Sequence, residues 1–161
     1  MTRLLLIGLL CISSLAAAQS MNTAKSESDN LLNAAVPFAE KMLTQHGEFY
    51  PYGAALTPTG QVVSVAATPG GERPPSAEVI KLLIAAFRQG AREGKYKATA
   101  LVYDAMVQLP ESSAKSDAIA VSLNHKEGYS VVVYLPYSRS GSGLSFGQVF
   151  AVSGASDVFA K

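Results

Sequence analysis

The chain has 161 residues, with 13 basic and 12 acidic side chains, a formal net charge of +1 and a single cysteine. This balance, without a cluster of Lys and Arg, lacks the electrostatic footprint of a protein that binds nucleic acid or an anionic membrane surface. The length is sufficient for one domain that buries its own core without a metal or a disulfide.

The first eighteen residues have the pattern of an export signal. Arg3 precedes an uncharged apolar run at residues 4–12, and the segment ends in Ala16, Ala17 and Ala18, the small residues that a signal peptidase accepts. The run is roughly half of the ~20 apolar residues that a membrane-spanning helix needs. We therefore expect residues 1–18 to be a signal peptide that is cleaved after Ala18, which predicts a periplasmic or secreted protein with no stable membrane insertion afterwards.

Cys11 lies inside this signal. A lipoprotein site would have a small residue before the cysteine, whereas Leu10 precedes it here, so lipidation of Cys11 is the lesser alternative. Cleavage would leave a chain without cysteine, which excludes disulfides, thiol nucleophiles and cysteine-bound zinc. Arg3 would leave as well, so that the 13 basic residues become 12 and balance the 12 acidic ones.

Residues 19–25 are small and polar and predict a disordered leader, followed by a single domain at residues 26–161.

Two segments of this domain have helical patterns. Apolar residues then recur at helical spacing up to Gly47, with Pro37 inside the pattern predicting a kink or a restart. A second amphipathic helix is expected to follow Ser76, as its N-cap, and to close at Gly94.

The other segments predict strands. Residues 49–56 and 61–65 flank a turn that contains Pro58 and Gly60, which is typical of a hairpin. Four more strands are expected within residues 96–109, 118–125, 129–137 and 144–152. The order α-β-β-α-β-β-β-β predicts an α+β fold, an antiparallel sheet of five or six strands with both helices packed on one face.

Pro136 is unusual inside such a strand. Proline cannot donate a hydrogen bond to a ladder, so we expect residues 135–137 to lie at an edge or a bulge.

One short motif matches a catalytic signature without its context. Residues 143–147 fit G-x-S-x-G, in which the serine should sit on a strand-to-helix turn and be followed by an acid and a histidine. Ser145 instead enters a predicted strand, and both His46 and His125 precede it. We therefore interpret the glycines as part of a hairpin.

His46 and Glu48 are two residues apart and could act as metal ligands or as an acid–base pair. A small hydrolase or metal-dependent enzyme would use His46 and Glu48, with Asp104 and His125 as candidates for further groups in the same pocket. His46 is also a cation of the kind that a helix C-terminus favours. We expect no catalytic group, no metal site and no cofactor, and keep the enzyme as an alternative.

Asp104 interrupts the most hydrophobic predicted strand. An acid facing the core would need a partner, such as Arg88 or Arg92 of the second helix, and its pKa would be shifted. Because buried acids are rare, we expect Asp104 to point to solvent or to lie at a bulge.

Five residues are candidates for a binding surface. Tyr50 and Tyr52 flank a proline, and Tyr134, Tyr137 and Arg139 lie near a glycine-rich tip. Tyrosine and arginine beside small flexible residues are typical of protein-binding surfaces, although tyrosine is also common in strands.

Three segments, residues 48–54, 97–104 and 117–121, carry a resemblance to known proteins. With its aromatic-x-proline-aromatic segment, the chain resembles a group of small bacterial α+β proteins to which no function is assigned. The resemblance implies the α+β fold and brings no site residues.

These features favour an exported, non-enzymatic binding protein whose partner is another protein. An inhibitor or an immunity protein against a periplasmic toxin or a cell-wall hydrolase would have these properties. The alternatives are the small enzyme described above and an envelope structural protein that associates through its sheet edge, as a monomer or a homodimer.

Overall fold

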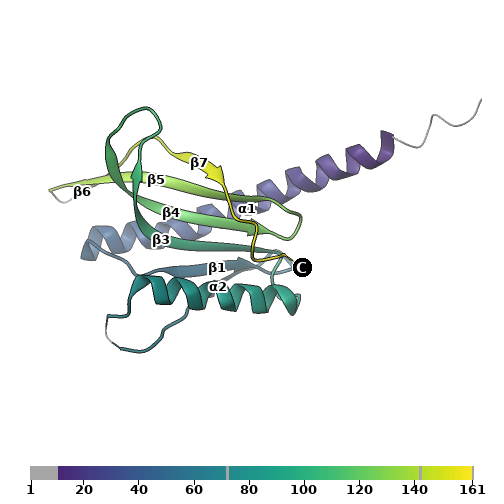
Figure 1. Ribbon diagram of the computed structural model, residues 1–161, viewed down its shortest axis with the longest axis horizontal. Helices are drawn as coiled ribbons and strands as arrows, with labels where there is room; N and C mark the ends of the chain where they lie inside the picture. The colour runs from purple at the N-terminus through teal and green to yellow at the C-terminus, as the bar shows by residue number, and fades with distance from the viewer. Residues whose placement is uncertain (1–10, 72, 142, 161) are drawn as a thin grey trace, which may run out of the picture.

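The computed structural model describes residues 11–71, 73–141 and 143–160, which form two helices and seven strands (Figure 1). The helices are α1 (Cys11–His46) and α2 (Ser76–Arg92). The strands are β1 (Tyr52–Leu56), β2 (Val62–Val65), β3 (Ala98–Gln108), β4 (Lys115–His125), β5 (Ser130–Ser140), β6 (Gly143–Phe146) and β7 (Phe150–Ser153).

All seven strands belong to one antiparallel sheet with the order β2-β1-β3-β4-β5-β6, and β7 pairs with the other half of β5. The three central strands, β3 to β5, have 11 residues each. The predicted α+β class is thus confirmed. The described part has one strand more than the expected order because the segment predicted at residues 144–152 is divided into β6 and β7.

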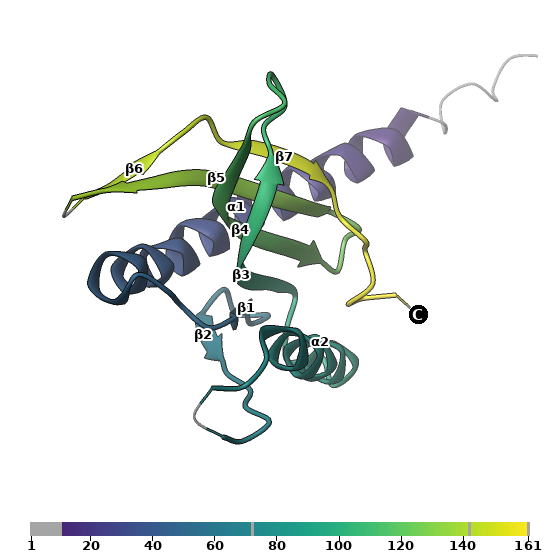
Figure 2. The ribbon, with the colours of Figure 1, turned by 60° about the vertical axis from the view of Figure 1, so that its left-hand side comes forward.

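The two helices cover opposite faces of the sheet (Figure 2). In β1, Ala54 belongs to the core that includes α1, and Ala55 belongs to the core that includes α2. Val102 and Leu101 of β3 divide in the same way. Successive side chains of a strand point to opposite faces, so the expectation that both helices pack on one face was wrong. We call the two sides the α1 face and the α2 face.

Helix α1 is longer than its apolar pattern predicts. It includes residues 19–25, which we expected to be a disordered leader, and Ala24 in this segment is buried. Residues 1–10 of the expected signal lie outside the described residues. No helix within residues 11–71, 73–141 and 143–160 is long and apolar enough to cross a membrane.

Pro37 lies within α1, and the helix continues through it. The Tyr52 hydroxyl of β1 donates to the Ala35 carbonyl at 2.7 Å and accepts from the Ala39 N–H at 3.1 Å. Those two backbone groups make up one i→i−4 step of the helix, so a side chain enters the hydrogen-bonded ladder beside the proline. We conclude that Tyr52 supports the helix where Pro37 weakens it.

The helix ends follow the sequence signals closely. Gly47 stops α1 with a φ of +75°, and Gly94 follows α2 with a φ of +69°. Ser76, which we expected to be the N-cap, is instead the first residue of α2. Pro75 is the N-cap, and no side chain in the described segments caps the helix. The stripe of α2 formed by Val79, Leu83 and Phe87 is buried against the sheet.

The edge outside β5 contains a bulge opposite Pro136. Phe146 of β6 pairs with Tyr137, and Phe150 of β7 pairs with Tyr134, so four steps along the edge match three along β5. The Gly147 N–H donates to the Pro136 carbonyl at 2.8 Å, and proline has no N–H to return. The expected bulge at Pro136 is therefore confirmed, in the strand that faces it.

Candidate functional site

The five candidate binding residues do not form one surface. Tyr52 and Tyr137 belong to the α1 face, whereas Tyr134 lies on the α2 face, where its ring packs against Phe150 with 5.2 Å between centroids. Tyr50 is exposed in the loop before β1. The Tyr52 hydroxyl is hydrogen-bonded to α1. Desolvation raises the pKa of Tyr52 to about 12, although the hydrogen bond from the Ala39 N–H opposes this shift.

Tyr137 is buried, and its hydroxyl donates to Asp104 Oδ1 at 3.0 Å. Asp104 is exposed, as expected from the sequence, but desolvation still raises its pKa. The nearby Asp117 adds to this shift, whereas the Tyr137 hydroxyl and Arg139 oppose it. Burial and the Asp104 charge raise the pKa of Tyr137 in turn.

The arginines take other partners than those proposed from the sequence. Arg139 is exposed, and its Nη1 donates to the Gly47 carbonyl at 2.7 Å, at the C-terminus of α1, where a positive charge is favoured. Arg88 pairs with Asp157 near the C-terminus at 2.6 Å instead of with Asp104. Arg139 thus belongs to the packing of α1 as well as to the exposed tip.

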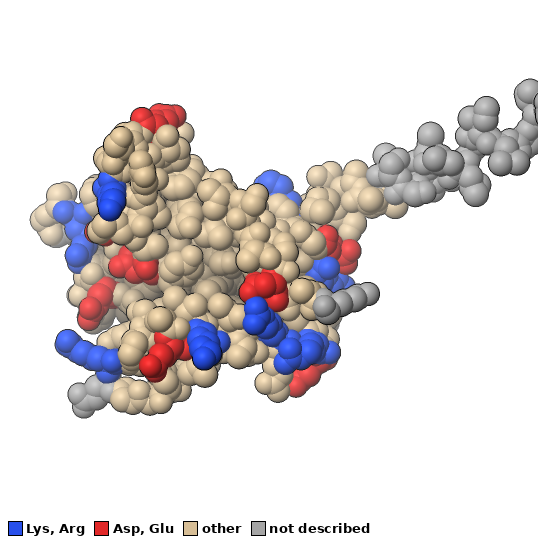
Figure 3. All heavy atoms as spheres, viewed as in Figure 1, with Lys and Arg blue, Asp and Glu red and all other residues tan. Residues whose placement is uncertain are grey.

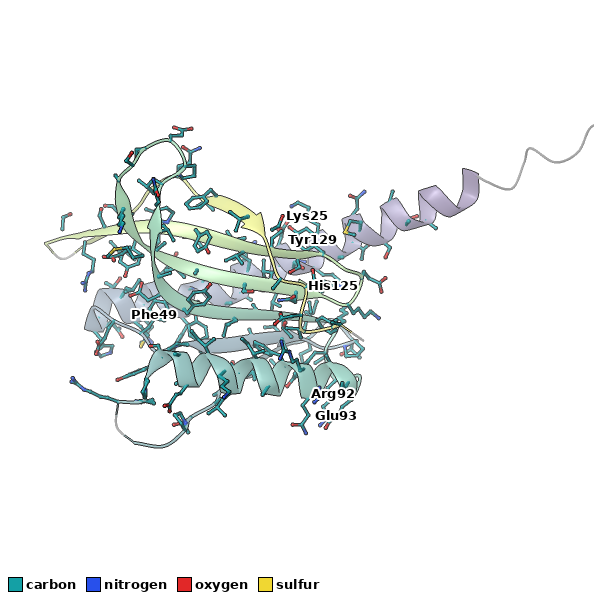
Figure 4. All side chains as sticks on the ribbon, viewed as in Figure 1. Lys25, Phe49, Arg92, Glu93, His125 and Tyr129 are labelled. Carbon is teal, nitrogen blue, oxygen red and sulfur yellow. The ribbon has the colours of Figure 1, made fainter. Side chains whose placement is uncertain are left out.

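A polar cluster that sequence reasoning missed joins α1 to the opposite end of the sheet. Glu27 Oε1 accepts from Lys97 Nζ at 2.6 Å, and Glu27 Oε2 contacts His125 Nε2 at 2.9 Å. We call these three residues the Glu27 cluster. Figure 4 shows His125 at the end of the sheet where Lys25 and Tyr129 lie, far from Phe49.

The backbone sets the tautomer of His125 in this cluster. The Glu127 N–H donates to His125 Nδ1 at 3.1 Å, so Nδ1 is an acceptor, and Nε2 carries the proton that faces Glu27. Desolvation alone would raise the pKa of Glu27, but the bonds from Lys97 and His125 together hold it below its ordinary value. The cluster lines a hollow of about 420 Å³, with Ser20 bonded to Glu127 at its rim.

Glu27 could have been noticed in the sequence because it lies four residues before Leu31, on the buried stripe of α1. A carboxylate on an apolar stripe requires a partner in the sheet.

The residues proposed for the enzyme alternative do not all converge. His125 pairs with Ala98 and Asp104 pairs with Ile119, so six residues of strand, about 20 Å, separate their positions. His46 is the exposed last residue of α1, and Glu48 is exposed just after it. Among the described residues, no group of three or more His, Cys, Asp and Glu could hold a metal ion.

A hollow of about 630 Å³ lies beside the edge bulge. We call it the edge groove. Its walls come from the β3–β4 loop and from the segment around the bulge, and its base from the ends of β4 and β5. The lining residues are Leu109, Pro110, Glu111, Ser112, Ser116, Pro136, Tyr137, Ser138, Ser145, Phe146, Gly147, Gln148 and Phe150.

The edge groove is apolar with hydroxyl groups around it. Glu111 is its one charged lining residue, and four serines are distributed over its base and walls. Phe146, one of the lining residues, is an exposed large apolar side chain, 43% accessible. Figure 3 shows uncharged side chains over the middle of the α2 face and charged ones toward its margins.

Comparison with known proteins gives no match to this chain, whether to a family model, to a curated protein sequence or to a solved structure.

Proposed function

We propose that this is an exported, non-enzymatic binding protein that holds a partner protein in the edge groove. More specifically, the protein would be an inhibitor or an immunity protein directed at a periplasmic toxin or a cell-wall hydrolase. The observation that carries the proposal is the edge groove itself, a hollow of about 630 Å³ whose lining residues include the exposed Phe146.

The composition of the groove supports a protein partner. Its aromatic and proline side chains supply apolar area, and the serines and Gln148 supply neutral hydrogen-bonding groups around that area. An apolar centre with a polar rim and few charges is the usual composition of protein interfaces. The groove includes Tyr137 of the expected binding surface, whereas Arg139 is bonded to Gly47 at the C-terminus of α1.

The packing of α1 is compatible with removal of the signal. From residue 16 on, where burial is described, residues 16–18 are exposed, Ser20 bonds to Glu127 on the sheet side, and Ala24 is buried. Of residues 16–18, which a cut after Ala18 would remove, Ala16 lines the 420 Å³ hollow.

Partner binding is tested by pull-down from a periplasmic extract with Phe146→Ser and Ser138→Trp. The first removes an exposed aromatic side chain, and the second fills the groove from an exposed position. We expect either change to weaken the captured partner roughly tenfold or more, as for an interface hot spot. Val62→Ser is the matched control, because Val62 is similarly exposed, at 41%, on the opposite edge strand. Equal retention by all variants would exclude the groove as the site.

Export is tested separately by mass spectrometry of the protein in the periplasmic fraction. We expect the chain to begin at Gln19, and Ala18→Arg to block processing because a large charged residue does not fit the peptidase. Cys11→Ser should leave processing unchanged. Loss of processing in Cys11→Ser would indicate the lipoprotein alternative instead.

A further inference from the structure

We propose that two copies of this protein pair along strand β7, so that their two sheets join into one continuous antiparallel sheet across a two-fold axis. The proposal goes beyond partner binding, because it concerns the edge next to the groove.

The outer side of β7 presents backbone groups for another strand. In the described sheet, β7 pairs with β5 alone. The Gly154 N–H donates to the Ser130 carbonyl at 3.1 Å. Because hydrogen-bonded pairs alternate along an antiparallel ladder, Phe150 and Val152 also turn their backbone groups to β5, and Ala151 and Ser153 turn theirs outward. An edge of this kind is a template for strand addition.

The chemistry of this edge fits a second copy of itself. The sequence has no charged residue from Ser140 to Ser156, so two copies meet there without repulsion between like charges. Edges that must stay unpaired usually carry lysine or proline, and β7 has neither. Val149, just before β7, and Val152 within it are 52% and 46% exposed. At the opposite edge, Val62 of β2 is the one large apolar side chain exposed to that degree.

The strand pattern fixes a register. Directly opposed residues of antiparallel strands point to the same face, so a two-fold axis normal to the sheet must pass through a residue. An axis at Ala151, the outward residue near the middle of β7, pairs Ala151 with Ala151 of the second copy through two backbone hydrogen bonds. It also sets Phe150 opposite Val152 of the second copy on the α2 face, an aromatic and β-branched pair that stabilises sheets.

The helices leave room for this pairing. Helix α1 packs mainly against β1, β3, β4 and β6, and α2 packs mainly against β1 and β3, so neither helix has an extensive contact with β7 in the described segments. Most of the edge groove lies toward β6, beyond the bulge, and it shares one lining residue, Phe150, with β7. Substitutions at positions other than Phe150 therefore separate dimerisation from partner binding.

Charge substitution at the axis provides the test, with sedimentation velocity as the measurement. Wild-type protein should form a dimer as its concentration is raised to about 1 mM. Ala151→Lys and Ala151→Glu should each become monomeric, with at least a tenfold weaker association, because like charges then oppose each other. An equimolar mixture of A151K and A151E should restore a dimer, which a merely unfolded variant could not do.

Ser64→Lys is the matched control. The Thr57 N–H donates to the Gln61 carbonyl, so by the same alternation Ser64 of β2 is an outward edge residue like Ala151. We expect S64K to stay dimeric. The proposal is overturned if the wild type is monomeric throughout, if A151K still dimerises, if the A151K and A151E mixture stays monomeric, or if S64K dissociates the dimer. Phe146→Ser should remain dimeric, and A151K should retain a captured partner, so failure here is distinct from failure of the proposed function.

Discussion

Glu27 and Asp104 lie on the same face of the sheet, at its two opposite ends. Folding shifts the pKa values of their carboxyl groups in opposite directions. Both are partly desolvated, which raises a carboxyl pKa. Around Glu27, Lys97 and His125 reverse that shift, and its pKa falls. Around Asp104, the Tyr137 hydroxyl and Arg139 do not outweigh desolvation and Asp117, and its pKa rises.

The difference teaches that a close cation decides the outcome, and that a neutral donor does not. The Lys97 ammonium is 2.6 Å from Glu27, whereas Arg139 at the other end bonds the Gly47 carbonyl. Hydrogen bonds from charged donors are roughly twice as strong as those from neutral ones. The Glu27 end of α1 is therefore expected to contribute more to stability than the Asp104 end.

Glu27→Ala should have the largest effect. The change leaves Lys97 and the buried His125 without their carboxylate. Removing one partner of a buried ion pair lowers the free energy of unfolding by about 3–5 kcal/mol. Because the Glu27 side chain is 24% exposed, we expect a loss of about 2–3 kcal/mol in the free energy of unfolding, measured by urea denaturation. Asp29→Ala is the control on the same helix. Its ion pair with Lys25 is exposed, so its loss should leave the free energy of unfolding nearly unchanged.

Gly47→Ala should come next, at the other end of α1. Gly47 has a positive φ, and a Cβ there would meet the Arg139 guanidinium. Gly94 has a similar φ with open space around it, so Gly94→Ala isolates the backbone cost of about 1 kcal/mol. We expect Gly47→Ala to cost roughly 1 kcal/mol more, in the same denaturation measurement. Equal losses would show that the Arg139 contact adds nothing.

Tyr137→Phe should cost about 1 kcal/mol, the usual net value of one hydrogen bond. It should also raise the pKa of Asp104 further, because the Tyr137 hydroxyl lowers that pKa at present. An NMR titration of the Asp104 carboxyl measures this shift. Tyr50→Phe, at an exposed tyrosine, is the control and should change neither quantity. An unchanged Asp104 pKa in Y137F would contradict the hydrogen bond.

The pH dependence should separate the two ends by sign. Glu27 has a lowered pKa, so its contribution is complete above its ordinary value of 4.5 and is lost as the pH falls through the folded pKa. Asp104 has a raised pKa, so its contribution is complete below 3.8 and is lost as the pH rises through the folded pKa. Unfolding between about pH 3 and pH 6 measures both. Relative to wild type, E27Q should lose less stability on acidification, and D104N should lose more.

Asp104→Asn at neutral pH should have the smallest effect. It removes a charge that folding disfavours and keeps an oxygen that can accept from Tyr137. We expect the free energy of unfolding to stay the same or to rise slightly at pH 7. A clear loss of stability would show that the Asp104 charge has a favourable partner.

Features set by neighbouring residues could be predicted from the sequence. The stop of α1 at Gly47, the turn at Gly60 and the start of α2 at Ser76 each depend on a few adjacent residues. The bulge opposite Pro136 could be predicted because the missing N–H is a property of the residue itself. The identity of the strand that bulges depended on sheet order, which the pattern did not contain.

Features set by distant residues could not be predicted in the same way. The partners of Glu27 are 70 and 98 positions away, and neither is marked by a motif. The placement of the helices on opposite faces is reflected in two of the central strands. Residues 53–56 and 98–102 are buried without alternation, which is typical of strands that are covered on both faces.

The separation of Glu27 from Lys97 and His125 also determines when the fold can be completed. A chain that emerges from its N-terminus first exposes α1 long before β4 exists, and contacts of such long sequence separation form late. Until residue 125 has emerged, the helix lacks His125 and the complete strand β4 beneath it. Folding of this protein therefore waits for most of its length. If the protein is exported as we propose, this delay keeps the growing chain open while a membrane channel threads it.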